Sequence, residues 1–447
     1  MTSSTQEAGR RAMSIAHARL TGGAKLRLGL TIAAAGAVLA ITACGAPSDS
    51  GGGGSKGNLN VGTLFPTSGT VAASGTDMLH GWQLWWKLNG STVAGRKIVS
   101  KQEDTAGDPT VTLSKARKLV QQNQSKIVVG PLLANEGYAL AGYLKQNQKV
   151  VGLNPVASSD DLSQRKRVSN YVRAGGWQSS TPAQPAGEWA ADQGWKRVIT
   201  LCNDYAFGYE NCGGFTNTFT DRGGKVIKQL YAPLGTSDYS SYLSQIDPKK
   251  VDGVFVETVG ADSPNFLKAW SDLGLKGKVP LIANETTTEQ SLLRNLKSNA
   301  PVGLQTFGHF AEGRKSPATQ RFVQEFRKAY GQLPSYYACA TYTAGQWLTT
   351  ALKQLKGDIS DPKKFVQTLN AVKLKDSCFG PLSLDRYGET VGNVYLRKVV
   401  RNERGDIVNE VVKTYPNVSQ FWHYDPRQFL AQPVYSRQYQ GADWPKR

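Results

Sequence analysis

Residues 126–154 read KIVVGPLLANEGYALAGYLKQNQKVVGLN and decide the class of fold. Two short runs rich in β-branched residues, Lys126–Gly130 and Val150–Asn154, flank a segment with the apolar spacing of a helix, Asn135–Gln146. Strand, helix and strand in this order form a βαβ unit, from which parallel sheets covered by helices are built.

The same alternation extends along the chain in two series. The first series also contains the expected strands Leu59–Phe65 and Lys97–Gln102 and the expected helices Asp77–Leu88 and Thr110–Gln124. The second series contains the expected strands Arg197–Cys202, Lys225–Tyr231, Gly253–Glu257 and Val279–Ala283 and the expected helices Gln178–Asp192, Glu210–Asp221, Tyr239–Gln245, Asn265–Leu273 and Glu289–Leu296. Two series of this kind predict an α/β protein with two doubly wound, parallel-sheet lobes.

The rhythm changes after the second series. Three helices, Ala318–Tyr330, Tyr336–Leu355 and Pro362–Ala371, precede a late pair of strands, Tyr395–Arg401 and Ile407–Lys413. Residues 418–447 are rich in Pro, Gln, Tyr and Arg, and we expect them to form a surface tail. The sequence predicts no function for this tail.

Composition excludes several classes of protein. The chain has 447 residues, of which 40% are hydrophobic and 19% are charged, as in an ordinary globular protein of two or three units. The formal net charge is +19, but beyond Arg165–Arg167, which we expect to form a solvated loop, the basic residues are scattered singly. No nucleic-acid-binding motif accompanies them, so we predict a basic solvated surface and no nucleic-acid partner.

The N-terminal segment has the pattern of an export signal. Lys25 and Arg27 precede a mostly apolar run, Leu28–Ala43, which is shorter than a membrane span. The run ends in Ile-Thr-Ala-Cys at residues 41–44, which resembles the lipobox of bacterial lipoproteins. This resemblance implies a signal peptide over residues 1–43 and diacylation of Cys44, followed by a Gly/Ser tether over residues 44–57. The alternative is a plain secretory signal with an incidental cysteine.

Four further cysteines remain after the leader: Cys202, Cys212, Cys339 and Cys378. An even number in an exported protein indicates two disulfides, for which three connectivities are possible. We favour the pairs 202–212 and 339–378, because each is locally plausible in the expected order of strands and helices. A metal site is the weaker alternative, because the sequence has no Cys-x-x-Cys and its histidines after the leader, at positions 80, 309 and 423, are widely separated.

The sequence lacks the motifs that most often carry catalysis. It contains no Gly-x-Ser-x-Gly elbow, no phosphate-binding loop, no Gly-x-Gly-x-x-Gly and no His-Glu-x-x-His. We therefore predict a protein that is not an enzyme and that uses neither a cofactor nor a metal. An extracellular enzyme on a related two-lobed scaffold is the competing hypothesis.

Several stretches resemble the class I periplasmic binding proteins of the leucine/isoleucine/valine-binding family, which feed ABC importers. The resemblance runs from about Leu59 to about Arg401. Its marks, in chain order, are Ser68-Gly69-Thr70 with Gly75, Glu103-Asp104 with Asp108-Pro109, Ile127-Val128-Val129-Gly130-Pro131, Asn154-Pro155, Asn203-Asp204-Tyr205-Ala206-Phe207-Gly208 and Phe379-Gly380-Pro381-Leu382-Ser383-Leu384-Asp385. Each mark alone is weak, but their order and their positions at expected strand ends are specific.

The resemblance implies two lobes joined by three chain crossings near Arg173, His309 and Asp385, with a ligand between the lobes and closure by hinge bending. One lobe is then expected to comprise residues 58–173 plus 309–385, and the other residues 174–308 plus 386–417, followed by the tail 418–447. Doubly wound sheets suit this arrangement, because their ligands bind beyond the carboxyl ends of the strands.

The family's ligand contacts can be placed by position. The resemblance implies contacts from Ser68, from the segment Val156, Ala157 and Ser158, and from the aromatic residues Tyr205 and Phe207. The serine that usually follows the third strand is absent, and Asn135 is the expected substitute as a donor. Glu285 matches the acidic partner of a ligand ammonium, an interaction made of charge-assisted hydrogen bonds. The alternative for Glu285 is an acid at the start of the next helix.

The resemblance also implies a function. It predicts a monomeric solute-binding lipoprotein on the extracytoplasmic face of the cell membrane, which delivers a branched-chain amino acid or a similar small amine or acid to an ABC permease. A sensor subunit of the same fold, or a binding protein for amides or aromatic acids, is the alternative.

Overall fold

The computed structural model describes residues 56–447 apart from 295, 297–298, 440 and 442–447. The predicted signal peptide, Cys44 and all but the last two residues of the tether lie outside the described residues. The described helices are α1 (Ala72–Asn89), α2 (Pro109–Gln121), α3 (Ala134–Gln146), α4 (Ser180–Asp192), α5 (Ala206–Asp221), α6 (Ser240–Leu243), α7 (Asp262–Asp272), α8 (Gln290–Leu293), α9 (Pro317–Tyr330), α10 (Tyr336–Gln354), α11 (Pro362–Ala371) and α12 (Pro426–Ala431), with 3-10 turns η1 (Asp160–Leu162) and η2 (Glu285–Thr288).

The first lobe is built on a six-stranded sheet with the strand order β2-β3-β1-β4-β5-β6. Its strands are β1 (Asn58–Leu64), β2 (Thr92–Val93), β3 (Arg96–Glu103), β4 (Ile127–Val129), β5 (Val151–Asn154) and β6 (Tyr171–Arg173). Only the β2–β3 pairing in this sheet is antiparallel. Alternate strand residues pack on opposite faces, so that Val129 contacts the core under α1 and α10 while Val128 contacts the core under α2 and α3. Helices therefore cover both faces.

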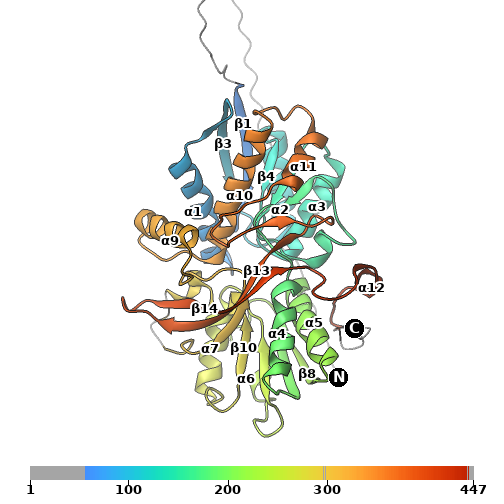
Figure 1. The fold of residues 1–447 in the computed structure, drawn as a ribbon, viewed down its shortest axis with the longest axis vertical. Coiled ribbons are helices and arrows are strands. Elements are labelled where there is room, and N and C mark those ends of the chain that lie inside the picture. The colour runs from blue at the N-terminus through green and yellow to red at the C-terminus, as the bar shows by residue number, and fades with distance from the viewer. Residues whose placement is uncertain (1–55, 295, 297–298, 440, 442–447) are drawn as a thin grey trace, which may run out of the picture. The chain divides into compact units, whose positions relative to one another are not determined.

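The second lobe is built on an eight-stranded sheet with the order β12-β13-β11-β10-β9-β7-β8, and β14 pairs with β13 (Figure 1). Its strands are β7 (Arg197–Asn203), β8 (Lys225–Ala232), β9 (Gly253–Val256), β10 (Leu281–Asn284), β11 (Gln305–Gly308), β12 (Ser383–Leu384), β13 (Thr390–Arg401) and β14 (Ile407–Val418). The pairings of β12, β13 and β14 are antiparallel and the others are parallel. Helices α4 and α5 cover one face, and α6 and α7 cover the other. The predicted pair of doubly wound α/β lobes is confirmed.

Helices α1 and α5 begin four or more residues earlier than the apolar pattern predicts. Helix α1 begins at Ala72 instead of Asp77, and α5 begins at Ala206 instead of Glu210. The first turn of α1 has small residues without a large apolar side chain, so the helical period is invisible there. At Gly75 a Cβ atom would lie 1.8 Å from the Pro66 carbonyl oxygen, so only glycine permits this close approach of helix and strand end.

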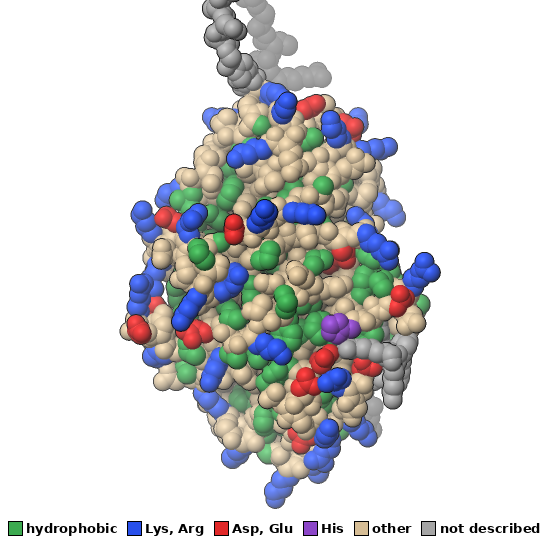
Figure 2. Space-filling view, viewed as in Figure 1, with side chains coloured by type: hydrophobic (Ala, Val, Ile, Leu, Met, Phe, Trp, Pro, Cys, Tyr) green, Lys and Arg blue, Asp and Glu red, His purple; other side chains and the backbone are tan. Residues whose placement is uncertain are grey.

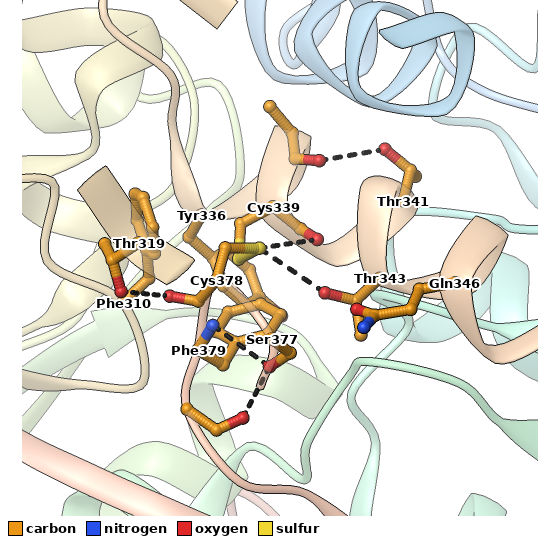
Figure 3. The surroundings of a disulfide bond; sticks show 12 residues. Phe310, Thr319, Tyr336, Cys339, Thr341, Thr343, Gln346, Ser377, Cys378 and Phe379 are labelled. Atoms are coloured by element: carbon orange, nitrogen blue, oxygen red, sulfur yellow. Dashed lines mark hydrogen bonds between the residues drawn. A yellow bond between two sulfur atoms is a disulfide. The ribbon is translucent and has the colours of Figure 1, made fainter. Parts of the chain in front are cut away.

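The predicted disulfides, 202–212 and 339–378, are both confirmed. The first joins β7 to α5 within the second lobe. The second joins α10 to the segment after α11 within the first lobe, where Thr319 donates to the Cys378 carbonyl at 2.9 Å (Figure 3). Both cross-links are buried, and each stabilises one lobe.

The two disulfides are expected to differ in their contribution to stability. Replacing both Cys339 and Cys378 by alanine should lower the free energy of unfolding by about 4 kcal/mol, whereas the same change at Cys202 and Cys212 should cost about 3 kcal/mol. The reason is that the 339–378 bridge closes a loop over 39 residues, whereas the 202–212 bridge closes one over 10. The longer loop constrains the unfolded chain more. Urea unfolding of the two double variants checks this, and the reverse order would contradict it.

The surface carries basic side chains over both lobes. On the face shown in Figure 2, Lys and Arg lie mostly as separate side chains among polar and apolar ones. Within the part of the chain that the structure describes, no helix is long and apolar enough to cross a membrane.

Candidate ligand-binding site

A cavity lies between the two sheets, at the carboxyl ends of their strands. The space that no atom occupies there is about 430 Å³ when the part open to solvent is included. The residues that line it are Leu132, Leu133, Ala134, Val156, Ser158, Trp177, Gln178, Ser179, Pro182, Tyr205, Phe207, Val259, Asn284, Glu285, Thr286, His309, Tyr336 and Tyr337. Both lobes contribute, as expected for a site at strand ends.

The start of helix α3 forms part of the first-lobe wall. The Leu133 backbone N–H donates to Glu136 Oε2 at 2.8 Å, and the Thr112 hydroxyl donates to Glu136 Oε1 at 2.9 Å, so this buried carboxyl group fixes the loop before the helix. The first N–H groups of a helix have no acceptor within the helix, and they carry partial positive charge. Ala134, the first residue of α3, lines the cavity. This wall therefore favours a negatively charged group.

Four of the predicted first-lobe contacts separate into two groups. Val156 and Ser158 line the cavity, whereas Ala157 between them is buried outside its lining and accepts from Asn154 Nδ2 at 2.8 Å. Asn135 is half-buried, and its Oδ1 accepts from the Glu136 backbone N–H at 3.0 Å, so it does not line the cavity. The structure thus brings only part of the predicted segment to the site.

The remaining predicted first-lobe contact, Ser68, lies in an exposed loop before α1. It hydrogen-bonds to Asp104, which also accepts from the Thr67 backbone N–H at 2.8 Å. The loop of Ser68 joins β1 to α1, and its hydrogen bond to Asp104 links it to the end of β3. Ser68 is not part of the cavity wall in the present arrangement of the lobes.

Aromatic rings surround the cavity. Tyr205 and Phe207 come from the start of α5, with ring centroids 6.1 Å apart, and both line the cavity. Sequence reasoning missed three more rings: Trp177, Tyr336 and Tyr337. Burial raises the pKa of the hydroxyl groups of Tyr205, Tyr336 and Tyr337 well above its usual value, which keeps these groups neutral.

Glu285 lies in the wall and already has protein partners. Its Oε1 is 2.8 Å from His309 Nδ1, its Oε2 accepts from the His309 backbone N–H at 2.7 Å, and Arg397 Nη1 is 3.7 Å from Oε2. Burial raises the pKa of the carboxyl group, but the charge and hydrogen bonds of His309 and the charge of Arg397 outweigh this effect and lower the pKa below its usual value. Glu285 is therefore a buried, ionised carboxylate.

Arg397 is fully buried beneath this wall. Its guanidinium donates to Thr306 Oγ1 at 3.0 Å, to the Phe310 carbonyl at 2.5 Å and to the Glu285 carbonyl at 3.1 Å. The sequence contains a signal for this residue that we did not use. Arg397 lies two residues from both Tyr395 and Val399 on β13, so the three share one buried face of the strand. A charged residue on such an apolar face indicates a buried ion pair.

Two ring nitrogens of the wall have no partner among the described residues. Trp177 stacks on His309 with centroids 4.1 Å apart, and neither Trp177 Nε1 nor His309 Nε2 has a hydrogen bond there. Because His309 Nδ1 faces the Glu285 carboxylate, which can only accept, Nδ1 carries the proton. His309 Nε2 and the indole Nε1 therefore lie close together, both without a partner among the described residues.

Glu257, which follows β9 behind the cavity, is expected to make stability depend on pH. Its Oε2 accepts from the Asn203 backbone N–H at 3.0 Å, and burial raises its pKa to about 8. In the unfolded chain the pKa is about 4.3, so the folded state holds a proton that the unfolded state releases between these values. The free energy of unfolding should therefore fall as the pH rises through this window, by at most about 1.4 kcal/mol per pH unit from this group.

The variant Glu257→Gln mimics the protonated side chain and keeps an acceptor for Asn203. It should exceed the parent in free energy of unfolding at pH 9, and the difference should vanish toward pH 4. Urea unfolding across this range checks it, and a constant difference at all pH values would contradict the assignment.

A family model described as periplasmic binding protein matches residues 58–405. The chain belongs to the periplasmic binding protein family. Binding proteins of this family bind small molecules outside the cytoplasm and deliver them to ABC permeases.

Curated and solved relatives agree with this membership. Leu/Ile/Val-binding protein homolog 6 of Brucella melitensis is 29% identical over 364 residues, which cover 80% of this chain and 91% of the relative. A solute-binding protein of Rhodopseudomonas palustris BisB5, solved with 3,4-dihydroxybenzoic acid, is 26% identical with a TM-score of 0.76, over 81% of this chain and 98% of that one. A leucine-binding protein of Thermotoga maritima shares the fold, at 19% identity and a TM-score of 0.70, over 80% and 99% of the two chains.

Among the described residues, no group of three or more His, Cys, Asp and Glu side chains is placed to hold a metal ion. The homologues and structural neighbours are solute-binding proteins rather than enzymes.

Proposed function

We propose that this periplasmic binding protein captures a branched-chain amino acid or a similar small amine or acid in the cavity and hands it to an ABC permease. The observation that carries the proposal is the pairing of two opposed polar groups across one small apolar cavity. The start of α3 favours an anion on one wall, and Glu285 offers a carboxylate on the other.

A zwitterionic ligand fits these two walls. Its carboxylate accepts from the first N–H groups of α3 and from the Ser158 hydroxyl, and its side chain packs against Leu132, Val156 and Val259. Its ammonium donates to Glu285 Oε1. A carboxylate oxygen accepts two hydrogen bonds, and the hydrogen bond from His309 Nδ1 occupies only one of these positions.

A second candidate ligand is a hydroxylated aromatic acid. The unpartnered pair of Trp177 Nε1 and His309 Nε2 favours it, because a hydroxyl oxygen can accept from the indole and can also pair with the imidazole nitrogen, as donor or as acceptor. An ammonium, which only donates, leaves the indole unpaired. The aromatic rings of the wall suit a flat ligand, and a relative at 26% identity was solved with 3,4-dihydroxybenzoic acid.

The experiment that tests the proposal is a melting-temperature screen of the purified protein after removal of bound ligand. We expect leucine, isoleucine or valine to raise the melting temperature, since ligand at 100 times its dissociation constant adds about 2.7 kcal/mol to the free energy of unfolding. Glu285→Gln should abolish the response. Glu289→Gln is the matched control, because Glu289 is also buried beside Arg397 but does not line the cavity.

Each outcome of this screen either identifies the class of ligand or contradicts the proposal. A response to hydroxybenzoates alone, retained in Glu285→Gln, supports the second candidate. No response to amino acids, amides or aromatic acids would overturn the proposed ligand class, although family membership would stand.

We further propose that the protein works as a monomer held at the extracytoplasmic face of the membrane through a lipid on Cys44. Two acyl chains on one cysteine support stable anchoring. In cells, Cys44→Ala should move the protein from the membrane fraction to the medium or periplasm. An unchanged membrane fraction would contradict the anchor.

A further inference from the structure

The C-terminal segment after β14 packs closely on the rest of the protein. We name residues 419–439 the C-terminal strap. It contains α12, whose first turn is capped by Asp425, and it buries Phe421, Phe429 and Tyr435, which remain 3%, 2% and 5% exposed. The strap lies beyond the residues that the family model matches. An added segment with this much buried aromatic surface has a defined position on the lobes.

The second lobe holds the strap at several points. Trp422 Nε1 donates to Glu188 Oε2 on α4 at 3.0 Å. Asn217 Nδ2 on α5 donates to the Tyr435 hydroxyl at 3.3 Å, and Arg437 pairs with Asp204 at 3.3 Å. Figure 1 shows α12 beside α5, close to where the two lobes meet. The strap is thus firmly attached to the second lobe.

The first lobe holds the strap through the loop between β5 and β6. Arg165 Nη2 donates to the Gln432 carbonyl at 2.6 Å and to the Phe429 carbonyl at 3.3 Å, at the C-terminal end of α12. Asp161, on the same loop, accepts from Arg165 Nη1 at 3.1 Å and orients the guanidinium. A cation is favoured at a helix C-terminus. Arg165 thus lies at the surface, as the sequence predicts, and its guanidinium group also contacts the strap.

Gln420 of the strap also reaches the chain connection from β6 to α4, which passes between the lobes. Its Oε1 accepts from Gln178 Nε2 at 2.8 Å, on the connection from β6 to α4, and from Gln164 Nε2 of the first lobe at 3.2 Å. Its Nε2 donates to Asp385 Oδ2 at 2.6 Å, on the connection from β12 to β13. One side chain thus ties one interlobe connection, the first-lobe loop and the β12–β13 turn of the second sheet together.

We propose that the C-terminal strap is a latch across the hinge, which stabilises the closed arrangement of the lobes, and that Arg165 is the positioning residue that engages it. The strap is attached to the second lobe, so rotation of the first lobe away from it breaks the bonds of Arg165 and Gln164. The latch shifts the balance between open and closed forms and thereby the apparent affinity for any ligand that needs closure. This inference rests on the proposed capture by hinge closure.

The test compares Arg165→Met with Lys166→Met in the ligand-free protein. Lys166 is the matched control, because it belongs to the same loop and carries the same charge, and its side chain is 62% exposed. Small-angle X-ray scattering should show a larger radius of gyration for Arg165→Met than for the parent and for Lys166→Met. Amide exchange in α12 should become about tenfold faster, because a charge-assisted bond is lost. Arg165→Lys should restore part of both effects.

The readouts need no ligand, so they remain informative if the proposed ligand class fails. Faster exchange in α12 without a change in radius would overturn the latch and leave the strap as a cover for α5. Equal radii and exchange rates in all variants would overturn any role for Arg165. If Arg165→Met fails to fold, Gln420→Leu, which removes the bonds to the first-lobe residue Gln164 and to the interlobe residue Gln178, replaces it in the same comparison.

Discussion

Replacing Arg397 by methionine is expected to lower the free energy of unfolding by about 3–5 kcal/mol. Methionine keeps the apolar stem of the side chain but removes the guanidinium group whose charge offsets Glu285. The variant then holds a buried carboxylate without its guanidinium partner, and the carbonyls of Glu285 and Phe310 lose their donors. Urea unfolding measures the change.

Lys398→Met on the same strand is the control, because Lys398 is exposed and changes the net charge equally. We expect its effect to stay within about 0.5 kcal/mol. Similar small losses in both variants would show that Arg397 contributes no more than a surface charge.

The second large effect is expected at the start of α3. Ala134→Asp places a negative charge where the ligand carboxylate is proposed to bind, and like charges in contact at a binding site cost several kcal/mol. The affinity for a carboxylate ligand should fall about a hundredfold or more. The helix itself tolerates the change, because an acid in the first turn is favoured by the helix dipole. Calorimetric titration with the compound that stabilises the parent measures the affinity.

Ala134→Asn separates charge from size in this prediction. Asparagine has nearly the same volume as aspartate and no charge, so it should retain much more of the affinity than Ala134→Asp. Equal losses in the two variants would mean that the added volume alone blocks the cavity, and that no carboxylate binds at this wall.

The fold could be predicted from the sequence because its signal is local. Each parallel strand is a short apolar run next to an amphipathic helix, as at Ile127–Val129 and α3. The spacing of the apolar residues distinguishes the strand from the helix. Very short strands such as β2 and β12, each of two residues, carry no period and were missed. Strand β6, of three residues, was missed for the same reason.

The site could be predicted only in part. Val156, Ser158, Tyr205, Phe207 and Glu285 follow strand ends, and the carboxyl ends of strands meet at one edge, so the structure brings them to one cavity. Asn135 and Ser68 also follow strand ends, but their side chains turn to local backbone or to a neighbouring loop. The direction of a side chain in a loop depends on contacts that the sequence does not show.

The pairing of Glu285 could not be predicted, because its partners come from distant parts of the chain. His309 follows β11, and Arg397 lies on β13, which crosses back beside β11 in antiparallel order. Their contact depends on sheet order. Sequence reasoning names the carboxylate, whereas the fold determines what neutralises it.

The interleaved course of the chain has a consequence for how the protein folds after export. The six-stranded sheet is complete at Arg173, but Trp347 and its neighbours on α10, which cover one face of that sheet, follow more than 160 residues later. A chain that emerges N-terminus first therefore leaves this apolar face bare, while β7 to β11 arrive in one uninterrupted stretch and pair at once. The lobe whose sheet forms first therefore waits for α10 and α11, and the second sheet is completed only by β14. Nascent molecules at this stage are those most in need of protection by chaperones outside the cytoplasm.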